Sequence, residues 1–155
     1  MAVDREKGTP AAAVKPTRKR KKSFMFEITS LAAKDTFVLE LLNGNDEPLT
    51  GADGKALSVT VYGPGSKPFV KAQAARTQRM LDRMAKKGKV KLDAAEQARE
   101  NADFLAACTV SFNGWAHHGK ADAEAVLAAY NDPTIGFIAD QVGKAVGDWG
   151  NFTNS

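Results

Sequence analysis

The side chains best suited to catalysis or metal binding lie near one another in the C-terminal half of the sequence: Cys108, His117 and His118. Such side chains can act as nucleophiles or hold a metal ion. A metal site needs further ligands at regular spacing, and no cysteine or acid lies at ligand spacing from the adjacent histidines. We therefore expect two exposed loop imidazoles, and no metal ligand is predicted.

A second candidate is the segment Gly63-Pro-Gly-Ser-Lys67, which has the residue types of a phosphate-binding loop. That loop requires four residues between its glycines before Gly-Lys-Ser/Thr, and Pro68 stands in the wrong place for it. The sequence also lacks a dinucleotide fingerprint, a Cys-x-x-Cys pair and a His-Glu-x-x-His motif. We therefore expect no enzyme, no catalytic residue and no cofactor.

Positive charge is concentrated in two segments of the chain. Residues 1–22 carry eight Lys/Arg against two acids, and residues 66–91 carry nine against one. The first segment has too few apolar residues to form a core, so it is predicted to be a disordered basic tail. Residues 23–155 are predicted to form a single α+β domain.

The compartment is predicted from the cysteine content and the hydropathy. Cys108 is the only cysteine, so an intrachain disulfide is excluded and a reducing compartment is favoured. No apolar run approaches the ~20 residues that a membrane span requires. We expect a soluble cytoplasmic protein with no membrane partner.

The first predicted element is a β-hairpin over residues 36–62. An apolar strand at 36–42 and an alternating strand at 57–62 are separated by a loop rich in Gly, Asp and Pro. Alternation around Phe26 predicts either an edge strand or an apolar arm over 23–33. Four helices are predicted to follow and to cover the hairpin or small antiparallel sheet; they span about 66–87, 93–109, 122–130 and 134–148.

The helix at 66–87 is predicted to start at the cap Ser66 and to end at Gly88. At 100° per residue its apolar residues share one arc, which we assign to the core. This arc contains Phe69, Val70, Ala74, Thr77, Met80, Leu81, Met84 and Ala85. The opposite side carries Arg76, Arg79, Arg83 and Lys86, and we predict that this basic face binds a partner.

The next helix, at 93–109, opens with a capping-box-like Asp93 and Glu96. Its apolar arc includes Cys108, which is therefore predicted to be a buried apolar residue rather than a nucleophile. Glu100 is predicted to face away from that arc. A basic helix followed by an acidic one indicates an antiparallel helical hairpin.

The last helix, at 134–148, carries three glycines on one side. Gly136, Gly143 and Gly147 fall within about 40° of one another at 100° per residue. Either another backbone, from this chain or a partner, packs along this stripe, or the helix is simply loose. Phe137 points away from the apolar arc, so Phe137 and Gly143 are predicted partner-binding residues.

The order of these motifs resembles that of a known family. A strand ending in Thr-Val-Tyr-Gly63 is followed by Ser66-Lys-Pro-Phe69, the arginine helix and Leu105-Ala-Ala-Cys-Thr-Val110. A Tyr130-Asn-Asp-Pro133 turn and a terminal Asn151-Phe152 complete the series. Over about 34–152 this arrangement is similar to the tail assembly chaperones of long-tailed bacteriophages, while the basic tail departs from it.

The resemblance implies a non-enzymatic role in building the phage tail. Such a chaperone would bind the tape-measure protein, keep it soluble and assist the assembly of tube subunits around it. It would act in the host bacterial cytoplasm and be absent from the mature virion. Its partners would be the tape-measure and tail tube proteins; self-association stays open.

Two other functions are compatible with the sequence. A nucleic-acid-binding protein would use the basic tail and the Arg76/Arg79/Arg83 face on phosphates. The aromatic residues, however, fall on core arcs rather than among the basic residues, unlike a base-stacking surface. A structural protein of the phage virion would instead use its N-terminal arm to hold neighbouring subunits.

Overall fold

The computed structural model describes residues 25–88 and 92–153, so the predicted tail at 1–22 lies outside the described residues. The described residues up to Ala32 and those from Ala33 onward belong to two separate units, whereas the predicted domain starts at residue 23. In the first unit, the 3₁₀ helix η1 (Ile28–Leu31) is capped by the Glu27 side chain. The alternative of an edge strand is therefore wrong, and the residues around η1 are exposed.

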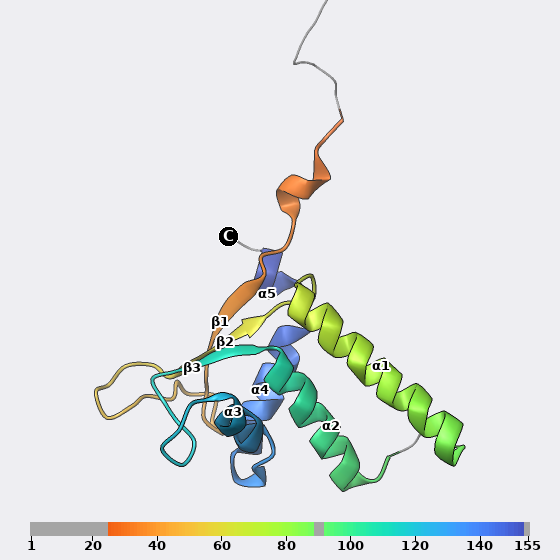
Figure 1. Ribbon diagram of the computed structural model, residues 1–155. Helices are drawn as coiled ribbons and strands as arrows, with labels where there is room; N and C mark the ends of the chain where they lie inside the picture. The colour runs from red at the N-terminus through yellow and green to blue at the C-terminus, as the bar shows by residue number, and fades with distance from the viewer. Residues whose placement is uncertain (1–24, 89–91, 154–155) are drawn as a thin grey trace, which may run out of the picture. The chain divides into compact units, whose positions relative to one another are not determined.

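The second unit is built on a three-stranded antiparallel sheet in the order β1-β2-β3 (Figure 1). The strands are β1 (Thr36–Glu40), β2 (Ser58–Tyr62) and β3 (Thr109–Asn113). The hairpin of β1 and β2 confirms the prediction, and with the helices below it confirms the α+β class. The third strand is a correction, because these residues were assigned to a helix end and a loop. A strand this short is stabilised by pairing with β2, which lies about fifty residues earlier in the sequence.

One face of the sheet supplies part of the core. Val59, Val61 and Phe112 are buried on this face, and Phe37 and Leu39 pack against the same core. The opposite face is polar, because the Asn113 side-chain amide donates hydrogen bonds to Ser58 Oγ and Thr60 Oγ1. The sheet therefore presents a single apolar face to the helices.

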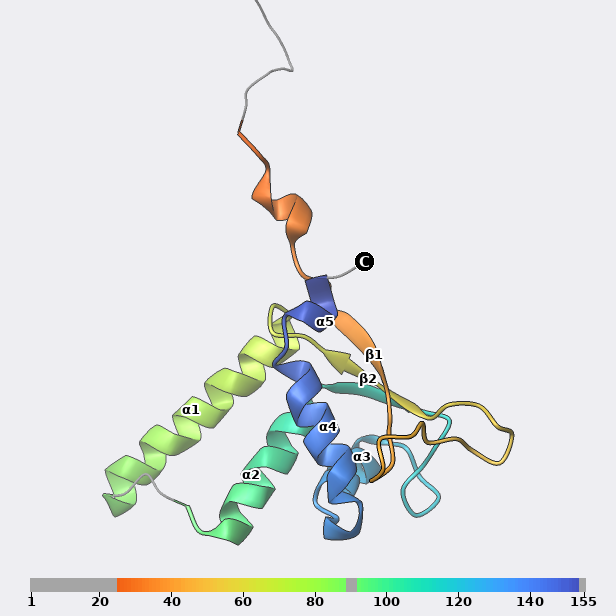
Figure 2. The same cartoon turned by 180° about the vertical axis from the view of Figure 1, so that it is seen from behind.

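Two helices form the predicted antiparallel hairpin. The helix α1 (Lys67–Lys87) begins at Ser66, whose Oγ accepts a hydrogen bond from Phe69 N–H, and ends at Gly88 in the left-handed conformation. The helix α2 (Ala94–Ala107) opens with the predicted capping box of Asp93 and Glu96. Figures 1 and 2 show the two helices side by side, running in opposite directions. Among the described helices, none is both long and apolar enough to cross a membrane.

The C-terminal part consists of α3 (Ala123–Tyr130), the 3₁₀ turn η2 (Pro133–Ile135), α4 (Gly136–Val146) and the short α5 (Gly150–Thr153). The predicted helix at 134–148 therefore starts as a 3₁₀ turn and ends earlier, at the C-cap Gly147. The Gln141 side chain joins α4 to the segment after β1. Leu42 N–H donates to Gln141 Oε1, and Gln141 Nε2 donates to Leu42 O, both at 2.8 Å.

Candidate functional site

The arginines of α1 lie against α2 rather than on an open face. Arg83 Nη1 is paired with Glu100 Oε2, and Arg79 Nε lies 3.6 Å from the same oxygen. The predicted outward orientation of Glu100 is therefore wrong, since only 14% of its side chain is exposed. One carboxylate neutralises part of the charge of two arginines and fixes α1 to α2.

Arg76, the first arginine of this face, packs on an aromatic ring of α2. Its guanidinium carbon lies 4.0 Å from the centroid of the Phe104 ring, a cation–π contact. Phe104 in turn packs edge-on against Phe69 at a centroid distance of 5.3 Å. Of the four predicted cations on this face, Lys86 is exposed, while Arg76, Arg79 and Arg83 are partly buried.

The opposite face of α1, assigned to the core from the sequence, is largely exposed. Phe69 is buried and Met80 is partly buried, but Val70, Leu81 and Met84 are 56%, 50% and 46% exposed. The assignment of this arc to the core is therefore confirmed for Phe69 and wrong for Val70, Leu81 and Met84. The reason is that α1 packs through Phe69, Ala72 and its arginines, a face turned away from Val70, Leu81 and Met84.

A groove of about 690 Å³ lies between α2 and α4, with Arg76 in its wall. It brings together Arg76 and Gly143, two residues predicted separately to bind a partner. Its charged residues are balanced, with Arg76 and Lys144 against Asp132 and Asp140. The other lining residues are Ala98, Asn101, Phe104, Leu105, Tyr130, Asn131, Pro133, Gly136 and Ala139. The lining is mainly apolar and suits a protein side chain better than a phosphate.

The three glycines of the predicted stripe occupy different positions in α4. Gly136 is the first residue of α4 and Gly147 is its C-cap, so only Gly143 lies in the helix interior. A Cβ placed on Gly143 would find its nearest neighbour, Leu105 Cδ2, 4.0 Å away, and none would lie within 4 Å of a Cβ on Gly136. In the described chain no backbone packs closely on this side of Gly136 or Gly143; the open space belongs to the groove. Phe137 is 38% exposed and does not line the groove.

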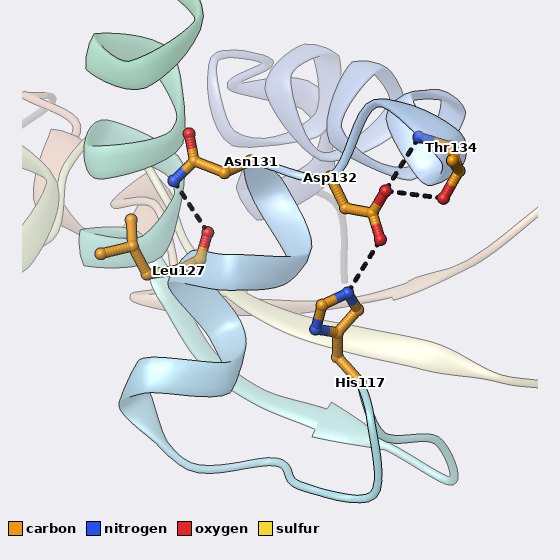
Figure 3. Close-up of polar contacts among 5 residues, drawn as sticks. All are labelled: His117, Leu127, Asn131, Asp132 and Thr134. Atoms are coloured by element: carbon orange, nitrogen blue, oxygen red, sulfur yellow. Dashed lines mark hydrogen bonds and ion pairs between the residues drawn. The ribbon is translucent and has the colours of Figure 1, made fainter.

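Asp132 lines the groove. Figure 3 shows its side chain between those of His117 and Thr134. Its Oδ2 lies 2.9 Å from His117 Nε2, and its Oδ1 accepts hydrogen bonds from Thr134 N–H and Oγ1. These bonds, with that from His117 the strongest cause, lower the pKa of Asp132 to about 2. The carboxylate is thus ionised and ties the loop after β3 to the start of η2.

Among the described residues, His117, His118 and Asp132 form a group that could hold a metal ion. Their ligand atoms lie within 4.8 Å of one another, so the tertiary structure supplies the acid that the sequence spacing lacks. His118 adopts a positive φ of 50°, and its ring centroid lies 4.2 Å from that of His117. Both Asp132 oxygens already accept hydrogen bonds, which accounts for this cluster as a structural clasp.

Two groups with raised pKa values lie in the interior. Burial raises the pKa of the Cys108 thiol to about 11 and that of the Tyr130 hydroxyl to about 12. Thr109 Oγ1 donates to Leu105 O, so the Tyr130 hydroxyl donates the 2.6 Å hydrogen bond between Thr109 and Tyr130. Both groups are neutral near pH 7, and the burial of Cys108 confirms the prediction from its helix arc.

Comparison with known proteins found no match to this chain among protein-family models, curated proteins or solved structures. The functional argument therefore depends on the residues themselves. The structure has a groove beside Arg76 in which acidic and basic residues are equal in number, and an exposed apolar face on α1.

Proposed function

We propose that this protein is a non-enzymatic tail assembly chaperone of a long-tailed bacteriophage. It binds the tape-measure protein and assists the assembly of tube subunits around it. The observation that carries this proposal is the exposed apolar face of α1, with Val70, Leu81 and Met84. A long helical tape measure exposes apolar stripes, which aggregate unless another protein covers them.

The sequence motifs support the same proposal. The series from Thr60-Val-Tyr-Gly63 to Asn151-Phe152 resembles that of the chaperone family. The role implies that the protein acts in the host bacterial cytoplasm and leaves before the virion matures. Phe137 and Lys86, both exposed, are further candidates for contact with the tape-measure or tube protein.

The alternative of a nucleic-acid-binding protein is less well supported by the arginine face. Arg79 and Arg83 are engaged with Glu100, and Arg76 packs on Phe104. Glu100 thus offsets part of the positive charge that this face would present to phosphates. An Arg76/Arg79/Arg83 triple Glu variant that abolished a strongly salt-dependent affinity for DNA would favour this alternative.

The proposal is tested by co-purification from phage-infected cells. We expect a tagged copy of this protein to retain the tape-measure protein before tail completion, and mass spectrometry of mature virions to lack it. Co-expression should also increase the soluble fraction of the tape-measure protein relative to an empty-vector control. Stoichiometric presence in purified virions would instead support a structural virion protein, and the absence of tape-measure and tube proteins from the purified complex would refute the proposal.

A further inference from the structure

Four exposed apolar residues of α1 and one threonine have a regular spacing. Val70, Ala74, Thr77, Leu81 and Met84 are separated by steps of four, three, four and three residues. We call these five residues the outer seam. A mean step of 3.5 residues is the spacing with which one α-helix packs along another. All five are exposed. Within the second unit, α1 lies at the outside, with α2 along one side of it (Figures 1 and 2).

The opposite side of α1 is held in place by the rest of the fold. Phe69 and Ala72 are buried, and Arg79 and Arg83 are anchored by Glu100. The outer seam is therefore presented on a helix whose orientation is already fixed. A preformed surface loses less conformational entropy when it binds.

We infer that the outer seam binds an amphipathic helix of another protein, whose apolar stripe is flanked by acidic residues. The inference rests on the proposed function in that the tape-measure protein would supply this helix. The binding mode is that of a helix laid along an apolar surface, read through residues one turn apart.

Charge complementarity identifies the acidic flanks. Lys67 and Lys71 are exposed and lie within about 100° of Val70 around the helix. Asp82, the only acid of α1, lies on the same border at about 120°, about three turns further along the helix, and accepts a hydrogen bond from Gln78. A helix with Glu or Asp beside its apolar stripe would meet Lys67 and Lys71 at the N-terminal end of this border.

The same charges count against a second copy of this chain as the occupant. Two α1 helices packed in parallel through their outer seams would bring Lys67 and Lys71 of both copies together. The seam also spans only about two heptads, whereas a self-standing coiled coil needs roughly three to four. A short seam suits a reversible contact with a longer helix, as a chaperone requires.

The seam has a shape that the partner must match. The small residues Ala74 and Thr77 lie between Val70 and the larger pair Leu81 and Met84. A bulky apolar residue of the partner can fit over the small side chains of Ala74 and Thr77. Met84 has an unbranched side chain that adapts to different neighbours. At 1.5 Å per residue the seam is about 20 Å long, the length of four helical turns.

The test measures binding of labelled synthetic helices to the full chain. Two peptides of about 21 residues share one apolar stripe with four-three spacing and carry either Glu or Lys beside it. We expect the Glu peptide to bind at least about tenfold more tightly at ~50 mM than at ~500 mM salt, and the Lys peptide to bind weakly at both. Leu81→Ser should weaken binding of the Glu peptide by about tenfold. The matched control Val110→Ser, an exposed apolar residue on β3, should leave binding within about twofold.

A charge reversal provides the second arm. The double variant Lys67→Glu/Lys71→Glu should prefer the Lys peptide, while the control Lys55→Glu/Lys120→Glu should keep the wild-type preference.

Failure of both peptides to bind, or equal binding by the Leu81→Ser variant, would overturn the inference. So would a dimer that dissociates on Leu81→Ser, because the occupant would then be a second copy. Retention of the tape-measure protein by the Leu81→Ser variant would refute the seam but leave the proposed function intact. Peptide binding by a protein that does not associate with the tape-measure protein would support the outer seam as a helix-binding surface and refute the proposed function.

Discussion

At the scale of single residues, Asp132 shows how a tertiary contact gives a common side chain a defined role. Its carboxylate accepts hydrogen bonds from His117 and Thr134, two residues on different segments. The bonds favour the ionised form, so the pKa of Asp132 falls to about 2. A clasp of this kind orders the loop after β3 and one end of the groove.

We expect the Asp132 clasp to stabilise the fold in a pH-dependent way. Because the pKa of Asp132 is lower in the folded chain than its ordinary 3.8, its contribution is present above about pH 4. The contribution is lost as the pH falls through this range toward 2. Urea unfolding at several pH values should show Asp132→Asn less stable than wild type near pH 6, with the gap closing toward about pH 2.5.

A suitable control is Asp46→Asn, since the Asp46 side chain makes no hydrogen bond within the described residues. Its effect on the urea midpoint should be small at each pH. A gap between wild type and Asp132→Asn that stayed constant down to low pH would show that the ionised carboxylate is not the stabilising group.

At the scale of elements, α1 shows that amphipathicity alone does not identify the buried side. The apolar arc of Val70, Leu81 and Met84 remains exposed, while the arginine side packs on α2. The arginines can be partly buried because Glu100 compensates their charge and Phe104 covers a guanidinium. The pairing of α1 with α2 therefore combines the Glu100 ion pairs with the contacts of Phe69 and Arg76 on Phe104.

We predict that Glu100→Gln destabilises the protein by about 1–3 kcal/mol, because Arg79 and Arg83 lose their common partner. The melting temperature should fall by roughly 3–9 °C for a domain of this size. Thermal unfolding followed by circular dichroism measures this change. Asp103→Asn, an exposed acid on the same helix, is the matched control. Equal melting temperatures for the two variants would contradict a stabilising role for the ion pairs.

The helix α4 gives a prediction in the opposite direction. Gly143 is interior to the helix, and an added Cβ would meet Leu105 only at an ordinary contact distance of 4.0 Å. Gly143→Ala should therefore raise the free energy of unfolding by up to about 1 kcal/mol, as measured in urea. A lower stability would indicate a close contact that the described chain does not contain.

A larger substitution, Gly143→Leu, extends this prediction to the groove. Its side chain should project into the groove without unfolding the protein, so it reports on partner binding there. In a partner pull-down both Gly143→Leu and Phe137→Ala should retain less tape-measure protein, the first by filling the groove and the second by removing a contact outside it. Normal partner binding by Gly143→Leu would show that the groove is not used.

At the scale of the whole second unit, its first and last segments are joined through Phe152. Lys34 N–H donates a hydrogen bond to Phe152 O at 2.7 Å, and the fully buried Phe152 ring lies 5.7 Å from the Phe37 ring. Gly63 lies directly beneath this ring, and a Cβ at that position would approach it to 2.4 Å. The glycine therefore makes room for the C-terminal aromatic residue.

We predict a specific coupling between Gly63 and Phe152. Phe152→Ala should cost about 3–5 kcal/mol through the cavity it leaves, and Gly63→Ala about 1–3 kcal/mol through the clash. In the double variant the added methyl group occupies part of the vacated space, so the combined loss should be smaller than the sum. Urea unfolding of all four proteins measures the coupling. Strict additivity would show that the two residues do not share this contact.

Several features could be predicted from the sequence alone. The caps Ser66, Asp93 and Gly88 depend on neighbours a few residues away. The β1–β2 hairpin was visible as two strand patterns around a turn-rich loop, and the burial of Cys108 as its place on an apolar helix arc. The buried side of α1 could not be predicted in this way, because it depends on Glu100 and Phe104 of another helix. The same applies to β3, which pairs with β2, and to Asp132, which reaches His117 across fifteen residues. Periodicity reports that a helix has two faces, and long-range packing selects the one that is covered.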